Sequence, residues 1–209
     1  MFLAARRQAI AFKKGMKMRY ILASKSPRRK ELLLELIKEF EIVTKEVDED
    51  LSEDIHPQNG VEILAIRKGK AVADEIGNDV IVISSDTLVE LDGIPLGKPK
   101  DKEEAFRMLS SLSGKAHNVH TGVAVHCRGR VFSGVATTAV YFREMTEDEI
   151  NEYIATGDPM DKAGSYGIQS GAGKFVEKIE GDYDTVVGLS LRLTKKLLIA
   201  CDRSFVIVN

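Results

Sequence analysis

The sequence predicts an α/β fold with α+β character, in which helices flank a mixed, partly antiparallel sheet. Short apolar runs typical of buried strands alternate along the chain with segments whose apolar residues recur at helical spacing. Capping signals mark where helices begin, and two neighbouring segments with alternating apolar residues predict an antiparallel pair. A length of 209 residues suits one domain, or one domain with two lobes, and we take residues 18–209 as that domain.

The first strand and the first helix are predicted at the start of this domain. The apolar run 20–23 fits a buried strand. Ser26 and Pro27 then begin a helix, as its N-cap and its first residue. Apolar residues at helical spacing give this helix one core face, formed by Leu32, Leu33, Leu36, Ile37 and Phe40.

A second helix is predicted at about residues 59–76, where an apolar stripe recurs at helical spacing and Gly77 follows as a stop signal. The run 80–83 is continuously apolar, which predicts a strand covered on both faces. The Asp92-Gly93 pair that comes after it predicts a tight hairpin turn.

Two further helices are indicated by their capping residues. Asp101, with Glu104 three residues later, begins a third helix. Thr146 and Glu149 form a capping box for a short helix that ends near Gly157. Both helices are therefore predicted from their first turns as well as from their apolar residues.

The remaining elements complete the mixed pattern of the domain. Residues 118–127 and 130–142 alternate well enough to predict two strands about a turn at 128–129. Residues 163–173 form a glycine-rich loop, and a final helix is expected at about 185–200. Strands mixed with helices in this way favour the mixed sheet.

Charge and cysteine usage exclude some partners. The net charge of -2 gives no hint of a nucleic-acid-binding surface, and no apolar run approaches the roughly 20 residues of a membrane span. The basic residues 1–17 are interpreted as a disordered leader, or as lying before the native start. Cys127 and Cys201 stand alone in the sequence, which predicts reduced thiols in a cytoplasmic protein.

The first candidate site lies where the first strand gives way to the first helix. A helix N-terminus carries partial positive charge and unpaired N–H groups, which suit a phosphate. Ser24 adds a hydroxyl there, and Arg28 and Arg29 add planar guanidinium groups that match phosphate oxygens. A capped helix with two solvated arginines would leave the same residues, so both interpretations stand at this point.

Carboxylates supply the second candidate site. Asp86 follows the apolar run 80–83, and ligands commonly bind at the carboxyl end of a buried strand. Its oxygens could hold a divalent metal or take a proton from an attacking water. Glu49 lies in an acidic cluster that would complete a metal site or would simply be surface charge.

Two lysines and a glutamine are candidates for contacts with a nucleotide. Lys68 and Lys98 offer the fixed positive charge that a phosphate chain needs, although most lysines are only solvated. Gln169, in the glycine-rich loop, offers a donor and an acceptor that match the imide edge of uracil or thymine. His120 and His126 share a face of one predicted strand, and we expect them to be surface groups.

Taken together, these segments resemble the Maf family of nucleoside triphosphate pyrophosphatases. The segments that carry the resemblance lie in the family's order, at residues 22–33, 85–87, 96–99, 112–114, 121–122, 161–169 and 187–189. The resemblance covers residues 18–200 and leaves out the leader. It implies one domain with two lobes around a nucleotide cleft.

The resemblance also implies roles for the candidate residues. Asp86 would be the catalytic proton acceptor, and Lys68 and Lys98 would contact the phosphates. The same cleft would hold Ser24, Arg28, Arg29 and Glu49. A divalent cation, Mg²⁺, Mn²⁺ or Co²⁺, would be bound through Asp86 and Glu49, and the family implies a homodimer.

Three positions separate the two branches of the family. Arg28, Thr87 and Gln169 resemble the branch that acts on dTTP and UTP, whereas the branch for 7-methyl-GTP has Trp, Gln and Glu there. We therefore expect metal-dependent hydrolysis of dTTP and UTP, or of modified pyrimidine nucleotides, to the monophosphate and diphosphate. The alternative is a non-catalytic nucleotide-binding regulator of septum formation and cell division.

Overall fold

The strands form one mixed sheet. The computed structural model describes residues 18–52, 55–77 and 79–203, so the predicted leader at 1–17 lies outside the described residues. In the described part of the chain the strand order is β2-β1-β3-β5-β6-β7, with β4 paired to β3. Their bounds are β1 (Arg19–Leu22), β2 (Glu41–Ile42), β3 (Val80–Leu91), β4 (Ile94–Leu96), β5 (Ala116–Cys127), β6 (Arg130–Phe142) and β7 (Val176–Glu180). The β1–β2 and β1–β3 pairs are parallel and the others are antiparallel, which confirms the predicted mixed sheet.

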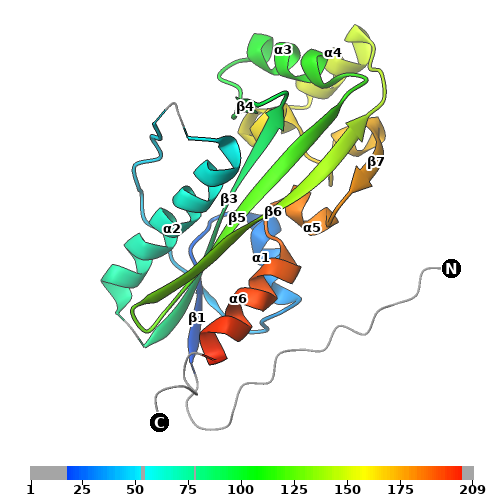
Figure 1. The fold of residues 1–209 in the computed structure, drawn as a ribbon. Helices are drawn as coiled ribbons and strands as arrows, with labels where there is room; N and C mark the ends of the chain where they lie inside the picture. The colour runs from blue at the N-terminus through cyan, green and yellow to red at the C-terminus, as the bar shows by residue number, and fades with distance from the viewer. Residues whose placement is uncertain (1–17, 53–54, 78, 204–209) are drawn as a thin grey trace, which may run out of the picture.

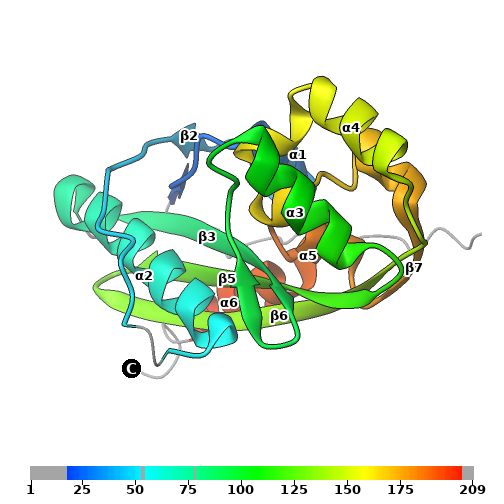
Figure 2. The same cartoon turned by 90° about the horizontal axis from the view of Figure 1, so that it is seen from above.

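Helices cover both faces of this sheet (Figure 1). The α-helices are α1 (Pro27–Leu34), α2 (Pro57–Ile76), α3 (Lys102–Leu112), α4 (Glu147–Ala155), α5 (Tyr183–Val187) and α6 (Leu191–Arg203). Helix α2 lies against β3 and β5 on one face, and α6 lies against β5 and β6 on the other. Figure 2 shows α3 and α4 side by side beyond one end of the sheet. No helix in the described ranges is long and apolar enough to span a membrane.

Three of the predicted helix starts are confirmed by their capping contacts. The side chains of Ser26 and Asp101 each accept a hydrogen bond from the backbone N–H of the third residue of their helix. Thr146 and Glu149 make both bonds of a capping box. Short polar side chains in extended backbone therefore fix where α1, α3 and α4 begin, as capping chemistry requires.

The predicted strand at 80–83 is much longer in the structure. It continues as β3 to Leu91, because β5 pairs with it from Ile81 opposite Cys127 to Glu90 opposite Asn118. Its apolar start indicated only the part that pairs with β1 and is covered by α2. The polar residues that follow remain in the strand because their backbone groups bond to β5.

The final helix predicted at 185–200 is broken in two. Gly188, with φ of 123°, ends α5, and α6 begins at Leu191. This backbone conformation is open to glycine and rarely to other residues. The Gly188 carbonyl accepts hydrogen bonds from Arg29 and Ser85, so the break is held against β3 by contacts that the helical pattern does not contain.

Two hydrophobic clusters lie one after the other along the same face of β3 and β5. The first contains Ile83 and Val123 with residues of α1 and α6. The second contains Val89 and Val119 with residues of α3 and α4. Between these clusters the face is polar, and we call this stretch the polar belt: Ser85, Thr87 and Thr121. The two clusters form the cores of two lobes that share the same strands.

The prediction of two reduced thiols is wrong for this structure. Cys127, at the end of β5, and Cys201, in α6, form a disulfide, and both side chains are buried in the first cluster. Their Cα atoms lie 6.6 Å apart across 74 residues of sequence. Helix α6 packs across β5 and brings the sulfurs together, which isolated positions in a sequence do not reveal.

Candidate active site

Asp86 lies within β3 and not after it, which corrects the position predicted from the sequence. The parallel partner β1 ends at Leu22, opposite Ile83, and β3 continues past it. Asp86 therefore lies three residues beyond the last β1–β3 pair, close to where the chain leaves β1 for α1. The carboxyl end of the parallel strands is therefore present where it was expected, but it is formed by β1 and β2, while β3 continues beyond it. Only 15% of the Asp86 side chain is exposed.

Lys68 joins the two predicted carboxylates. Its Nζ donates to Asp86 Oδ1 at 2.6 Å and lies 2.8 Å from Glu49 Oε1. The Lys68 side chain is 19% exposed, whereas Glu49 is 61% exposed. The neighbouring Lys70 pairs with Asp74 on the outer side of α2, with both side chains more than half exposed. Of the two nearby lysines, Lys68 is the one that faces Asp86.

The direct packing of α2 on the sheet sets this geometry. Gly122 lies opposite Asp86 on β5, and a Cβ there would be 2.2 Å from the backbone carbonyl oxygen of Val61 in α2. A Cβ on Gly69 would be 2.5 Å from Ser84 Oγ. The two glycines let α2 lie close enough for Lys68 to reach Asp86.

Arg29 is half-buried behind β3, and its hydrogen bonds go to the protein itself. Its guanidinium donates to the carbonyls of Gly188 and Ser85, at 2.9 and 2.7 Å, and to Thr87 Oγ1 at 3.2 Å. Burial lowers the pKa of Arg29, and the nearby negative charges of Asp86 and Glu49 act against that shift. Arg29 thus adds half-buried positive charge near Asp86 while it fixes the α5–α6 break to β3.

Ser24 and Arg28 lie at the same end of the sheet. Ser24 is buried, and its Oγ accepts from the Ser26 N–H at 3.2 Å and from the Arg29 guanidinium at 3.4 Å. Arg28 is half-buried. The pKa of Asp161 is lowered mainly by its hydrogen bond from Lys162, with a smaller contribution from the positive charge of Arg28.

Thr87 belongs to the polar belt on the face opposite Asp86. Its Oγ1 lies 3.0 Å from Thr121 Oγ1 and accepts from Arg29. Thr121 in turn donates to the Thr185 carbonyl at 2.7 Å. The belt therefore joins β3 and β5 to α5 through hydrogen bonds where both hydrophobic clusters end.

Lys98 and Gln169 are exposed on loops that belong to the second lobe. Lys98 follows β4, and the carbonyl of Gly97 accepts from the Gly164 N–H at 3.0 Å, which ties that loop to the glycine-rich segment. The hydrogen bonds of the described residues link neither side chain to Asp86. Their contacts with a nucleotide stay predictions, whereas Asp86, Lys68, Glu49 and Arg29 are brought together.

The carboxylates fit one divalent cation that is shared with a phosphate ligand. Asp86 and Glu49 already converge on a single cationic group, the Lys68 ammonium. The described residues contain no group of three or more histidine, cysteine or acidic side chains that would bind a metal unaided. Mg²⁺ is commonly bound by one or two carboxylates together with substrate phosphates and water. The donor set suits that mode of binding.

The expectation that His120 and His126 are surface groups is wrong, because both are buried in the centre of the sheet. His120 lies between Glu90 Oε2, at 2.9 Å, and Thr137 Oγ1, at 2.8 Å. Glu90 is four residues after Asp86 on the same face of β3. Sequence reasoning missed this pair, although the even spacing of Asp86 and Glu90 in a strand was a usable signal.

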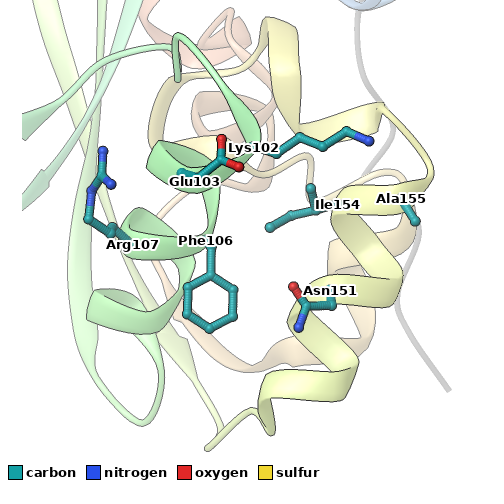
Figure 3. A pocket seen from close by; sticks show the side chains of 7 residues that line it. All are labelled: Lys102, Glu103, Phe106, Arg107, Asn151, Ile154 and Ala155. Atoms are coloured by element: carbon teal, nitrogen blue, oxygen red, sulfur yellow. The ribbon is translucent and has the colours of Figure 1, made fainter.

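A separate pocket of about 480 Å³ lies between α3 and α4. Figure 3 shows Phe106 and Ile154 between the two helices, with Lys102 and Arg107 at its margin. It contains none of the residues predicted for the site, and it lies in the second lobe.

A family model matches most of the chain, and named relatives are about half identical to it. A family model described as "Maf-like protein" matches residues 19–201. Proteins named "dTTP/UTP pyrophosphatase" from Alkaliphilus metalliredigens, Geobacillus sp. and Vibrio cholerae are 49%, 51% and 48% identical to this chain. The alignments cover 83%, 83% and 85% of this chain and 91%, 93% and 95% of those proteins. Among solved structures, the Staphylococcus aureus Ham1 protein aligns over 90% of this chain and 97% of its own, at 14% identity and a TM-score of 0.46.

Proposed function

The chain belongs to the family of Maf-like proteins, and we propose that it hydrolyses dTTP and UTP to the monophosphate and diphosphate. The relatives named "dTTP/UTP pyrophosphatase" are about half identical to this chain over most of their length. The observation that carries the proposal is the contact of Asp86 with Lys68, next to Glu49 and near the half-buried Arg29. In such an arrangement the carboxylate can accept a proton from an attacking water, and the fixed cations around it can bind a polyanionic substrate.

In this mechanism Asp86 accepts the proton of a water that attacks the α-phosphorus. The bond between the α-phosphorus and the α–β bridging oxygen breaks, and diphosphate leaves. Lys68, 2.6 Å from Asp86, balances the charge of the carboxylate and then that of the phosphates. Lys98 and Arg28 neutralise further phosphate oxygens, and Ser24 offers a hydroxyl at the start of α1.

Asp86 and Glu49 would hold the divalent cation, Mg²⁺, Mn²⁺ or Co²⁺, which supplies charge neutralisation on the phosphate oxygens. Glu49, the more exposed carboxylate, is free to turn towards a substrate, since 61% of its side chain is accessible. A Glu49→Gln variant should raise the metal concentration needed for half-maximal activity more than it lowers the rate with saturating metal.

Pyrimidine selectivity is assigned to Arg28, Thr87 and Gln169. The Gln169 amide pairs with the imide edge, where an N–H lies between two carbonyls. Modified pyrimidines such as 5-methyl-UTP and pseudo-UTP keep that edge and belong to the proposed substrate class. The enzyme is proposed to be a cytoplasmic homodimer that does not bind nucleic acid. The cytoplasmic assignment does not rest on the cysteines, because they are paired.

The test is a diphosphate-release assay on dTTP, UTP, CTP, 5-methyl-UTP, pseudo-UTP and 7-methyl-GTP, with each metal and with a chelator. Asp86→Asn should abolish turnover, whereas Asp74→Asn, the same change on the outer side of α2, should leave it intact. A purified Asp86→Asn variant with wild-type rates would refute the assignment. Binding of dTTP without release by the wild type would instead support the non-catalytic regulator of septum formation, and release from 7-methyl-GTP but not UTP would overturn the branch.

A further inference from the structure

The turn that carries Gln169 is held at both of its ends. The Ser170 N–H donates to the Gly167 carbonyl at 3.1 Å, which closes a turn with Gln169 at its third position. The Gly167 N–H donates to Tyr153 Oη at 3.1 Å, and Ser170 Oγ donates to Asp158 Oδ2 at 2.5 Å. Gln169 is exposed, but the residues that set its direction are not free to move.

The two anchors belong to one hydrogen-bonded network. Tyr153 Oη donates to Asp158 Oδ2 at 2.5 Å. Lys162 Nζ contacts Asp158 Oδ1 at 2.9 Å and the Asp158 carbonyl at 2.6 Å. The Asp158 carboxylate therefore receives a bond from a phenol, a hydroxyl and an ammonium at the same time. Tyr153 and the Lys162 side chain are largely buried, Asp158 is partly buried and Ser170 is exposed. Hydrogen bonds that share one acceptor group in this way restrict one another, because moving one member weakens the bonds of the others.

The network is anchored in the second hydrophobic core. Tyr153 is 2% exposed, lies in α4 and belongs to the cluster that holds α3 and α4 together. A Cβ on Gly167 would be 2.6 Å from Ser170 Oγ and 2.7 Å from Lys162 Cε, so the turn has almost no room against the network. A shift of the turn would require a shift of these side chains.

The protonation states keep the contacts in place near neutral pH. Burial raises the pKa of Tyr153, and its hydrogen bond to Asp158 raises it further, so the phenol remains a donor. Burial opposes ionisation of Asp158, but hydrogen bonds from Ser170, Tyr153 and Lys162 outweigh that effect and lower its pKa. The carboxylate is therefore an acceptor on both of its oxygens.

We propose that Tyr153, Asp158 and Ser170 are positioning residues for base recognition, which fix the 167–170 turn so that Gln169 meets the imide edge of a pyrimidine. The proposal deepens the proposed function and rests on it. These side chains do not touch the nucleotide and act only through Gln169. Their loss should raise KM and weaken the choice between bases, while Asp86 and its cations keep kcat nearly unchanged.

The sharpest test is a pair of variants that differ only in a hydroxyl, Ser170→Thr and Ser170→Val. Ser170 is exposed and in extended backbone, so both branched side chains fit without burial. The loss of one hydrogen bond corresponds to about a five- to tenfold effect. We expect Ser170→Val to raise the KM for dTTP and to lower the ratio of kcat/KM for dTTP over CTP by that factor, with kcat within about twofold. Ser170→Thr should retain wild-type values.

A second pair addresses the other anchor. Tyr153→Phe removes the acceptor for the Gly167 N–H and should give the same split between KM and kcat. Tyr141→Phe is the matched control, since its hydroxyl also bonds a carboxylate, Glu180, at 2.8 Å but on the exposed β6–β7 surface. The control should leave both KM and base preference unchanged.

Amide hydrogen exchange separates the failure of this inference from the failure of the proposed function. Exchange at the Gly167 and Ser170 amides should accelerate about five- to tenfold in Ser170→Val and not in Ser170→Thr, whatever the enzyme hydrolyses. Unchanged exchange would overturn the claim that the network holds the turn. Faster exchange with unchanged KM and base preference in an active enzyme would overturn the role in recognition. A wild type that releases no diphosphate would overturn the proposed function and the recognition role together.

Discussion

A single methyl group on Gly122 should separate Lys68 from Asp86. The new Cβ would lie 2.2 Å from the Val61 carbonyl oxygen and 2.4 Å from its carbonyl carbon, against the 3.4 Å at which ordinary contact begins. Both atoms belong to the backbone of α2, so rotation of a side chain cannot relieve the overlap. The helix must therefore withdraw from the sheet by roughly 1 Å.

The size of the effect follows from that displacement. Forcing one extra carbon into a packed interior costs about 1–3 kcal/mol, which for a domain of this size corresponds to a fall in Tm of roughly 2–10 °C. Since α2 carries Lys68, the same movement lengthens a contact that is now 2.6 Å. A misplacement of about 1 Å can reduce activity about 100-fold, so we expect kcat/KM for dTTP to fall by about 10- to 100-fold.

The assay compares Gly122→Ala with Gly134→Ala by thermal unfolding and by diphosphate release. Gly134 also lies in the sheet, in β6, but its added Cβ would meet only the tip of Leu193, at 3.3 Å, which can move aside. The Tm of the Gly134→Ala control should stay within about 2 °C of the wild-type value, and its kcat/KM within about twofold. If Gly122→Ala lost stability but kept wild-type kcat/KM, the position of α2 would not govern the site. If it kept both, the close packing of α2 itself would be refuted.

Three further outcomes are expected. Lys68→Met should lower kcat/KM by about 100-fold and Lys70→Met by less than about twofold, and equal losses would contradict the distinction between them. Burial lowers the pKa of His117 from 6.5 to about 4, so between these pH values the imidazole is protonated in the unfolded chain and neutral in the folded protein. The free energy of unfolding should therefore decline by about 3 kcal/mol as the pH falls from 6.5 to 4. Urea unfolding at pH 7 and pH 4 should show a smaller decline of this free energy for His117→Gln than for the wild type. Dithiothreitol should lower the free energy of unfolding of the wild type by about 4 kcal/mol and leave Cys201→Ala unchanged, and a wild type insensitive to it would argue against the Cys127–Cys201 bond.

Local signals were enough to predict much of this fold from the sequence. Ser26, Asp101 and Thr146 mark helix starts because capping is decided by a few neighbouring residues. The β5–β6 hairpin was predictable for the same reason, since alternation and turn chemistry lie close together in the chain. The association of Asp86 with Lys68 was also expected, because the family resemblance assigned them to one site.

The features that were missed depend on contacts between distant segments. β3 continues through Asp86 because β5 pairs with it, and β5 begins 30 residues after that aspartate. Cys127 meets Cys201, and His120 meets Glu90, only after α6 and the strands have packed. The same holds for the Gly188 break, which is stabilised by Arg29 from the start of the chain.

The shared strands have a consequence for how the protein can move. β3, β5 and β6 extend without interruption from one hydrophobic cluster to the other. A hinge rotation of one lobe against the other would therefore have to bend three hydrogen-bonded strands, because in the described part of the chain no flexible loop alone connects the lobes. Under the proposed function, capture of a nucleotide would then depend on small movements of exposed side chains, such as those proposed for Lys98 and Glu49, around a sheet that keeps its shape. The shared strands also couple the two lobes in unfolding. Partial proteolysis should therefore leave no single lobe as a stable fragment.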